Sequence, residues 1–404
     1  MNNQQNKLNA KENQMMLFCL LSYYGFAYKD KKDVQEKVDY IVWIYNRYLD
    51  YAKISWGPVA AKPIINNSEA EELVTCALMY VAKHDTDEKA TPEYTLAIRG
   101  TNPISLYAWL CLDLDVKQQE LWSDALNKFG PKPEKAIDVG EDIKISRATY
   151  SALGIHVGLK DDEGRTVLDW ISNTIEKGNP KKIKLNITGH SMGGVLSTTL
   201  GLWLHERLAE KGLLQYVDLS IYSFAAPTAG NNAFVTHTEK RLRGKYKCYI
   251  NELDMVTHAW AEENVRKLPK IYQQKGDIQI EPIRAELKTL ASLLEQCKDK
   301  KYQRLDSQQS IYSDVRYVSI VVRTTYLAEA IYQHIAPYLY DFDDALRFWL
   351  GVGIVLDILR YLARSSACTD SAGNTLELIV SQEEMDDLCN FVKDEVEKQK
   401  EIDL

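Results

Sequence analysis

The chain has 404 residues, of which 45 % are apolar and 26 % are charged. This balance excludes a disordered chain, a collagen and a polytopic membrane protein. The 49 basic and 57 acidic residues give a net charge of −8, so we expect no nucleic acid partner. The seven cysteines form no CxxC pair and are odd in number, which favours a reducing compartment over a disulfide or zinc framework.

Two apolar segments near the N-terminus predict helices, from Met15 to Tyr28 and from Val34 to about Tyr51. The first lacks a small-residue cleavage site and a strongly basic flank, so we expect a core helix and not a signal peptide. Neither it nor the run from Phe348 to Leu359 reaches the roughly 20 residues of a membrane span, and we expect no integral span. Extended runs at Cys76 to Ala82 and Tyr94 to Ile98, joined by a polar turn, predict a hairpin.

The central part of the chain alternates between helices and strands. In order, the pattern predicts a helix capped by Thr166 and Asp169, a strand at Lys182 to Ile187, a helix after Ser191, and strands at Val217 to Phe224 and Lys247 to Asn251. Such an alternation is typical of a mainly parallel sheet covered by helices. The sequence therefore predicts an α/β fold in which residues 1–404 form a single domain.

Two helical segments fall outside this alternation. The charged segment 262–314 predicts a helical insertion, whose apolar face would hold Ile283, Leu287, Leu290 and Leu294. The second segment is a helical C-terminal extension over 345–404, in which Ser381 and Glu384 cap a last helix.

The sequence Gly189-His190-Ser191-Met192-Gly193 lies between a predicted strand and a predicted helix. This is the G-x-S-x-G pattern in the strand–turn–helix context that a nucleophilic serine requires. The glycines permit a tight turn that lifts the hydroxyl above the sheet edge, and the helix N-terminus faces any oxyanion that forms. A phosphate-binding loop would need three spaced glycines or a Lys-Ser/Thr pair, which this loop lacks. The motif therefore predicts a nucleophile at Ser191.

A serine hydroxyl needs a neighbouring base, usually a histidine that a carboxylate orients. Seven histidines are available, and four are excluded by their position in the chain. His190 adjoins the serine, and its side chain is directed elsewhere, whereas His205 lies roughly 21 Å along the helix. His84 and His156 precede the serine, against the expected chain order of serine, acid and histidine.

The three remaining histidines differ in their order relative to the acid. Asp254 is the best acid candidate because it follows a strand and would reach the sheet edge of the serine, with Glu252 as the alternative. His258 lies four residues after Asp254 and shares its loop, and His237 precedes the acid. His334 comes last, so we predict that it is the base; the alternative is a core or surface histidine.

Five segments of the chain resemble class 3 lipases, a family of filamentous fungal triacylglycerol lipases and bacterial relatives. They are Arg99-Gly100-Thr101, the serine motif, Phe224 to Asn231, Tyr249 to Val256 and Tyr332 to Tyr338. The resemblance implies an α/β-hydrolase fold and ester hydrolysis through Ser191, His334 and Asp254. The reaction needs neither cofactor nor metal, and we interpret the acidic runs at 113–115 and 341–344 as solvated faces and not calcium sites.

The same resemblance implies an oxyanion hole and a lid. Thr101, through its amide and hydroxyl, and Met192, through its amide, would stabilise the oxyanion. The segment 102–112 would form the lid, and a buried helix is the alternative. The apolar lid residues are Ile104, Leu106, Tyr107, Trp109 and Leu110.

These observations predict a serine carboxylester hydrolase that acts on acylglycerols or other lipid esters at an oil–water interface. A phospholipase A1, including one delivered to another cell, is the alternative among hydrolases. A non-catalytic lipid-binding protein on the same fold is the alternative from another class, although it would not need the complete set of site residues. The stretch 145–150 departs from the His-x-Gly-Phe-like segment usual in the family, which leaves the preferred ester open. Oligomeric state and localisation also stay open.

Overall fold

A computed structural model describes residues 8–22, 52–61, 77–84, 90–100, 116–176, 182–273, 281–305, 308–310 and 326–339. Within these residues a seven-stranded sheet has the order β1-β2-β3-β6-β7-β8-β9. The strands are β1 (Ala52–Ala61), β2 (Ala77–His84), β3 (Glu93–Ile98), β6 (Ile183–His190), β7 (Val217–Phe224), β8 (Tyr246–Ile250) and β9 (Gln308–Ser310). The strand β1 has no counterpart among the predicted elements.

The sheet combines antiparallel and parallel pairing. β1, β2 and β3 pair in antiparallel fashion, which confirms the predicted hairpin, and from β3 to β9 every neighbouring pair is parallel. The register sets Ile98 beside Gly189, His190 beside Phe224 and Phe224 beside Tyr249. The carboxyl ends of β3, β6, β7 and β8 therefore meet at one sheet edge, as a mainly parallel sheet requires.

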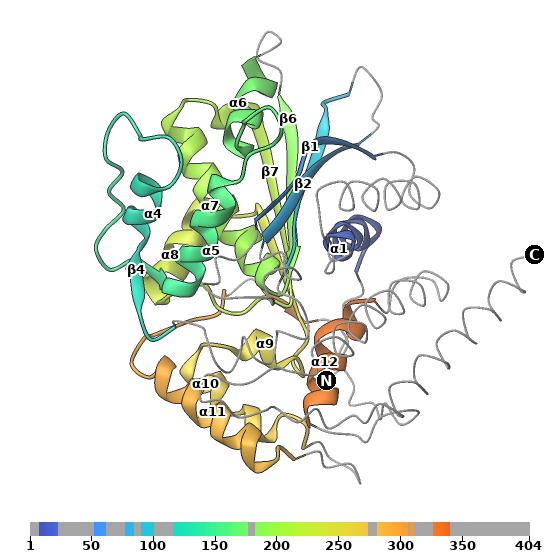
Figure 1. The fold of residues 1–404 in the computed structure, drawn as a ribbon, viewed down its shortest axis with the longest axis vertical. Coiled ribbons are helices and arrows are strands. Elements are labelled where there is room, and N and C mark those ends of the chain that lie inside the picture. The colour runs from blue at the N-terminus through green and yellow to red at the C-terminus, as the bar shows by residue number, and fades with distance from the viewer. Residues whose placement is uncertain are drawn as a thin grey trace, which may run out of the picture.

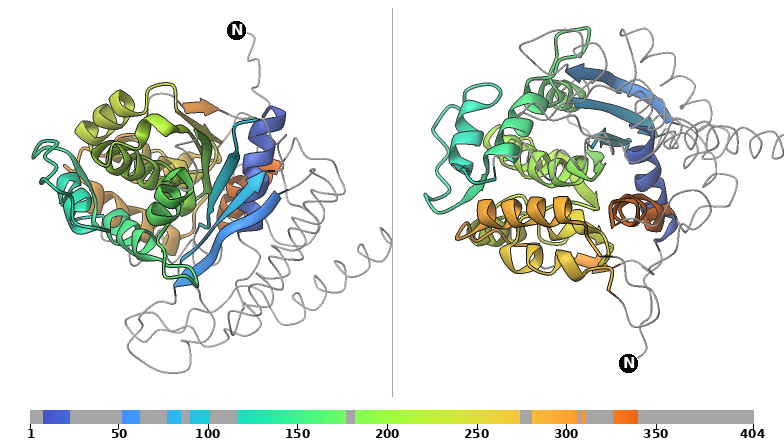
Figure 2. Two further views of the ribbon diagram at one scale, coloured as in Figure 1. Left: turned by 90° about the horizontal axis from the view of Figure 1, so that it is seen from above. Right: turned by 60° about the horizontal axis from the view of Figure 1, so that its bottom comes forward.

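Helices cover both faces of the sheet (Figure 1). One face carries α4 (Trp122–Lys128), α5 (Arg147–Gly158), α6 (Val167–Glu176), α7 (Met192–Glu210) and α8 (Asn232–Arg241). Figure 2 shows α1 (Ala10–Leu21) on the opposite face. The short strands β4 (Gln119–Leu121) and β5 (Lys144–Ser146) form a separate antiparallel pair, and the 3₁₀ turn η3 (Leu214–Tyr216) precedes β7. The predicted α/β layering is confirmed.

Capping explains where two predicted helices begin. The Asn9 side chain accepts from the Glu12 amide, and the Glu12 carboxylate accepts from the Asn9 amide, so α1 begins five residues before the predicted Met15. In α6 the Asp169 amide donates to Thr166 Oγ1 at 3.3 Å and the Asp169 carboxylate accepts from the Thr166 amide at 3.0 Å, which confirms the predicted cap. The predicted helices at 34–51 and after Ser381 lie outside the described residues.

The segment 262–314 contains helices and also a strand of the main sheet. Its elements are α10 (Glu262–Val265), η4 (Leu268–Lys270), α11 (Arg284–Cys297) and β9, which pairs with β8. The apolar face predicted for α11 is wrong at two positions, because Ile283 and Leu287 are 54 % and 44 % exposed. Leu290, Leu293 and Cys297 are buried instead, since the helix turns this side toward the core that contains Trp260 and Tyr272.

The remaining helices lie at the carboxyl edge of the sheet. They are α9 (Met255–His258), α12 (Tyr326–Ile335) and η5 (Ala336–Leu339), and Figure 1 shows them with α10 and α11 at this end of the molecule. No helix in the described part of the chain is long and apolar enough to cross a membrane.

Candidate active site

The turn between β6 and α7 holds Ser191 in an unusual backbone conformation, with φ 61° and ψ −126°. Such a conformation is costly for a residue with a side chain and is typical of functional turns. The Ser191 amide donates to the Phe224 carbonyl at 2.9 Å, and the Ser191 carbonyl accepts from the Gly194 amide at 2.9 Å. These bonds tie the turn to β7 and to the first turn of α7, and together they hold the strained residue in place.

Two glycines permit the close approach of chain segments that this turn needs. A Cβ at Gly189 would lie 1.9 Å from the Gly193 carbonyl oxygen, and a Cβ at Gly193 would lie 2.3 Å from the Ile98 carbonyl oxygen. No other residue type fits at either position without moving backbone. The end of β3, which leads to Arg99 and Gly100, therefore passes directly against the N-terminus of α7.

Asp254 lies where β8 ends and forms the N-cap of α9. Its carboxylate is fully buried, and its three partners all donate to it. Oδ1 accepts from the Val256 amide at 2.9 Å, and Oδ2 accepts from His334 Nδ1 at 2.8 Å and from the Tyr338 hydroxyl at 3.1 Å. Donors from three directions stabilise the charged form of a buried carboxylate.

His334 lies in the last turn of α12 and is 1 % exposed. The bond from its Nδ1 to Asp254 fixes the tautomer, so Nε2 is the nitrogen that can accept a proton. The serine that the sequence predicts as nucleophile is 1 % exposed, and its Oγ has no hydrogen-bond partner among the described residues. The structure thus brings Ser191, Asp254 and His334, three residues far apart in the sequence, to the same edge of the sheet.

A buried amide pair joins the acid loop to the helix that carries His334. Asn251 Nδ2 donates to the Gln333 carbonyl at 2.7 Å and to Gln333 Oε1 at 2.8 Å, and Gln333 Nε2 donates to Glu329 at 2.7 Å. Asn251 Oδ1 accepts from the Leu253 amide at 2.9 Å, which shapes the loop before Asp254. Because all these groups are buried and bonded, the spacing between the acid and the histidine is fixed by hydrogen bonds on both sides.

Tyr338 completes this arrangement from η5. Its hydroxyl accepts from the Asn251 amide at 2.9 Å and donates to Asp254 Oδ2 at 3.1 Å. Burial, together with the neighbouring Asp254 carboxylate, raises the pKa of Tyr338 well above its ordinary value, so the hydroxyl stays protonated and can donate. Sequence reasoning missed Tyr338 and Asn251, since no local pattern marks a tyrosine or asparagine as a partner of a distant carboxylate.

The histidines that the sequence set aside have other partners. His237 Nε2 contacts Glu206 Oε1 at 2.6 Å between α8 and α7, and His258 Nε2 donates to the Glu252 carbonyl at 2.9 Å. His190 was set aside because its side chain leaves the serine in another direction, and its Nε2 lies 2.8 Å from the His334 carbonyl oxygen. What the sequence did not predict is that α12 packs where this side chain lies.

The remaining predicted site residues are only partly described. Met192 is the first residue of α7, where backbone N–H groups lack intrahelical partners, and it is 9 % exposed. Thr101 and the predicted lid, with Ile104, Leu106, Tyr107, Trp109 and Leu110, lie outside the described residues. So do the acidic runs at 113–115 and 341–344. Over the part of the chain that is described, no cluster of three His, Cys, Asp or Glu side chains could hold a metal ion.

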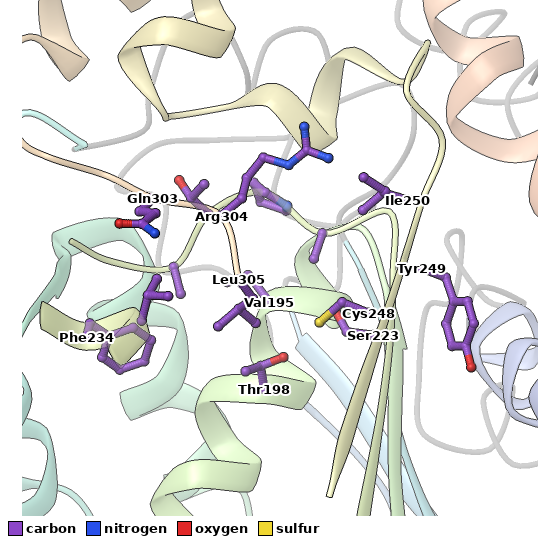
Figure 3. Close-up of a pocket in the computed structure, with 15 residues that line it drawn as sticks. Val195, Thr198, Ser223, Phe234, Cys248, Tyr249, Ile250, Gln303, Arg304 and Leu305 are labelled. Carbon is purple, nitrogen blue, oxygen red and sulfur yellow. The ribbon is translucent and has the colours of Figure 1, made fainter. Parts of the chain in front are cut away.

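A small crevice lies beside α7, between the ends of β7 and β8 and the segment 303–305 (Figure 3). Its volume is about 30 Å³, which is room for about two water molecules and too little for an acyl chain. Val195, Thr198 and Arg304 line it, whereas Tyr249 points away toward the opposite face of the sheet (Figure 3). The crevice is therefore a packing feature behind the serine turn and not a substrate pocket.

Comparison with known proteins agrees with this geometry. Residues 95–264, which include the serine turn and Asp254, match the model of a family described as Lipase (class 3). With the mainly parallel sheet, this match defines the class: the chain has an α/β-hydrolase fold, is a carboxylic ester hydrolase and is similar to class 3 lipases over these residues. The expected resemblance to class 3 lipases, the fold and the enzyme class are confirmed. No curated protein matches the chain.

Among solved structures, the chain is similar to M37 lipase. The identity is 27 % and the TM-score is 0.70, over 88 % of this chain and 100 % of that one. Lipase II from Rhizopus niveus matches at 15 % identity and a TM-score of 0.42, over 64 % of this chain and 78 % of that one. Rhizomucor miehei triacylglyceride lipase matches at 17 % identity and a TM-score of 0.40, over 63 % of this chain and 77 % of that one. The similarity to M37 lipase supports a lipolytic hydrolase.

Proposed function

We propose that this chain hydrolyses acylglycerol esters through a covalent acyl-enzyme, with Ser191 as nucleophile, His334 as base and Asp254 as the orienting acid. The observation that carries the proposal is the 2.8 Å bond from His334 Nδ1 to the buried Asp254 carboxylate. This bond lies at the sheet edge where the turn at Ser191 ends β6. A nucleophile and an oriented base at one site are what acyl transfer requires.

The proposed steps follow from these positions. Ser191 Oγ attacks the ester carbonyl carbon while His334 Nε2 takes the hydroxyl proton. The Nδ1–H bond to Asp254 stabilises the imidazolium that forms, and the leaving alcohol then receives the proton from Nε2. A water molecule, deprotonated by the same nitrogen, then attacks the acyl carbon. As the bond to Ser191 Oγ breaks, Nε2 returns the proton to this oxygen, which releases the carboxylic acid and restores Ser191 and the neutral base.

The oxyanion of the tetrahedral intermediate would be held at the N-terminus of α7. We assign the Met192 amide as one donor, because it follows Ser191 directly and is the first residue of the helix. The second donor would be Thr101, since the chain at Ile98 already contacts Gly193. Each donor of this kind is typically worth roughly 100-fold in rate, because it meets charge that develops only in the transition state.

Acylglycerols are the preferred substrate class in this proposal. The matched family and the name of M37 lipase support lipid esters, and the apolar residues of segment 102–112 fit a lid at a lipid surface. A phospholipase would need a cation for the phosphate. Arg304, which lines the crevice near the acid loop, has its guanidinium 3.4 Å from Glu252, so part of its charge is already neutralised. This pairing favours acylglycerols over phospholipids in the proposal.

The test compares wild type and Ser191→Ala on three substrates: p-nitrophenyl esters of increasing acyl length, a triacylglycerol emulsion and phosphatidylcholine vesicles. We expect wild-type release of fatty acid from the emulsion at a rate at least tenfold above that from the vesicles, and none above background in Ser191→Ala. A preference for the vesicles would identify a phospholipase. Wild-type protein that binds the emulsion without hydrolysing any ester would identify a lipid-binding protein on a lipase fold.

A further inference from the structure

His190 precedes the proposed nucleophile and points to the opposite face of the sheet, where it meets the end of α12. It is 3 % exposed, and its Nε2 lies 2.8 Å from the carbonyl oxygen of His334. The rings of His190 and His334 have their centroids 4.6 Å apart, and the Tyr338 ring meets the His190 ring edge-on at 5.5 Å. One side chain therefore contacts two residues of the site on the side away from the serine hydroxyl.

The hydrogen bond from His190 satisfies a backbone carbonyl at the C-terminus of α12. His334 is the penultimate residue of α12, and the last carbonyl groups of a helix have no intrahelical donor. Pro337, three residues further on, has no N–H that could donate to this carbonyl. His190 supplies a donor from β6, so the end of α12 is fastened to the strand that carries the serine turn.

The donor role requires a neutral His190 with its proton on Nε2. Burial, and then the proximity of His334, lower the pKa of His190 well below its ordinary value. The ring is therefore uncharged at neutral pH and does not repel the imidazolium that His334 becomes during the proposed reaction.

We propose that His190 is a positioning residue, which holds the proposed base His334 against Asp254 by donating a hydrogen bond to the His334 carbonyl. This inference rests on the proposed function, and it explains why a histidine stands before the serine. The peptide bond between His190 and Ser191 and the bond from His190 to His334 join nucleophile and base directly. A displacement of about 1 Å in such a pair can cost roughly 100-fold in rate.

The experiment replaces His190 by Leu, which cannot donate, and by Gln, whose amide can donate at a similar reach. The matched control is His84→Leu, because His84 is also buried, bonds Thr95 Oγ1 at 2.7 Å and packs edge-on against Phe18 at the opposite sheet edge. In a soluble short-chain ester assay we expect His190→Leu to lower kcat by roughly 10- to 100-fold with KM within about twofold. His190→Gln should recover most of kcat, and His84→Leu should keep kcat within about twofold.

The split between kcat and the folded fraction separates positioning from simple destabilisation. A destabilised but correctly arranged enzyme loses active molecules, whereas a displaced base lowers kcat in each folded molecule. We therefore measure the folded fraction by circular dichroism and expect a lower kcat per folded molecule in His190→Leu, and neither in His190→Gln nor in His84→Leu.

The outcomes distinguish the two proposals. An active wild type whose folded His190→Leu variant keeps kcat within about twofold overturns the positioning role and leaves the proposed function intact. Wild-type activity that survives Ser191→Ala overturns both. Should His190→Leu fail to fold, His190→Gln and His190→Asn carry the test, because the two amides differ only in reach. The longer amide should give the higher kcat, and equal values overturn the inference.

Discussion

Two histidine–carboxylate pairs, one fully and one largely buried, lie in different parts of the molecule, and their contact distances are nearly the same. His334 Nδ1 is 2.8 Å from Asp254, and His237 Nε2 is 2.6 Å from Glu206. The first pair lies at the carboxyl edge of the sheet beside the strained turn at Ser191. The second pair joins α7 to α8 within the helix layer. A short contact between a histidine and a carboxylate therefore does not by itself define an active site.

The neighbours of each carboxylate make the difference. Glu206 also accepts from the Trp122 indole at 2.8 Å and faces Arg241 at 3.5 Å, so it serves as a junction of three helices. Among the described residues, the Asp254 carboxylate accepts instead from the Val256 amide, from His334 and from Tyr338, and the proposed mechanism uses the other nitrogen of His334. The surroundings of each carboxylate, and not its distance from the histidine, therefore distinguish the two pairs.

The largest expected effect contrasts the two histidines. His334→Ala should lower kcat by roughly 10⁵-fold or more, because a serine hydroxyl without its base is a weak nucleophile. His237→Ala should keep kcat within about threefold, since its ring contacts only the helix layer. Both are measured as initial rates on a soluble ester, with circular dichroism as the control for folding. A collapse of activity in His237→Ala, with His334→Ala active, would reverse the assignment of the two pairs.

Substitution of the two carboxylates should change kcat almost as differently as substitution of the two histidines. Asp254→Asn removes the acceptor that fixes the His334 tautomer, and we expect kcat to fall by roughly 10⁴-fold. Glu206→Gln should leave kcat nearly unchanged but lower the free energy of unfolding by about 1–3 kcal/mol, because Trp122 and His237 lose a charged partner. Steady-state kinetics and urea unfolding on both variants measure these values. Equal losses of kcat would show that the pairs are not distinct in function.

A smaller effect is expected at the hydroxyl that supports Asp254. Tyr338→Phe keeps the buried ring but leaves the Asn251 amide and Asp254 Oδ2 each without one partner. We expect a loss of about 1–3 kcal/mol in the free energy of unfolding and a decrease in kcat of roughly tenfold. KM should change little, because the tyrosine lies behind the acid. Unchanged kcat in a destabilised variant would reduce Tyr338 to a purely structural role.

Local patterns in the sequence predicted much of the fold. The strand β7 has the predicted bounds, β6 and β8 lie within a few residues of theirs, and the cap at Thr166 and Asp169 is as predicted. These elements are predictable because hydrophobic period and capping chemistry act over a few residues. The orientation of α11 was not predictable, since Leu287 and Leu293 are equally apolar and only the tertiary core selects between them.

The candidate site divides in the same way. Ser191 could be proposed from its motif, Asp254 from its position after a strand and His334 from its order in the chain. Each of these signals is local or linear in the sequence. The supports at Asn251 and Tyr338 could not be proposed, since their hydrogen bonds span more than 80 positions. The side chain of His190 was expected only to leave the serine in another direction, and its partner depends on where α12 packs. Long-range packing, not local propensity, determines these contacts.

A last effect concerns the pH dependence of stability and a histidine whose described bond is to a carbonyl, not a carboxylate. His156 in α5 is 3 % exposed, and its Nδ1–H donates to the Ala152 carbonyl at 2.7 Å. Burial lowers the pKa of His156 to about 4. The ordinary value near 6.5 applies in the unfolded chain, so between these two values the unfolded state binds the extra proton.

Stability is therefore complete above about pH 6.5 and falls as pH is lowered toward about 4, with a total loss from this histidine of roughly 3 kcal/mol. His84, whose pKa burial also lowers to about 4, adds a loss of the same sign. In His156→Gln we expect a weaker decline of the free energy of unfolding over this range, measured by urea titration at several pH values. His84 still titrates in that variant, so part of the decline should remain. Identical declines in the two proteins would show that burial does not lower the pKa of His156 below its value in the unfolded chain.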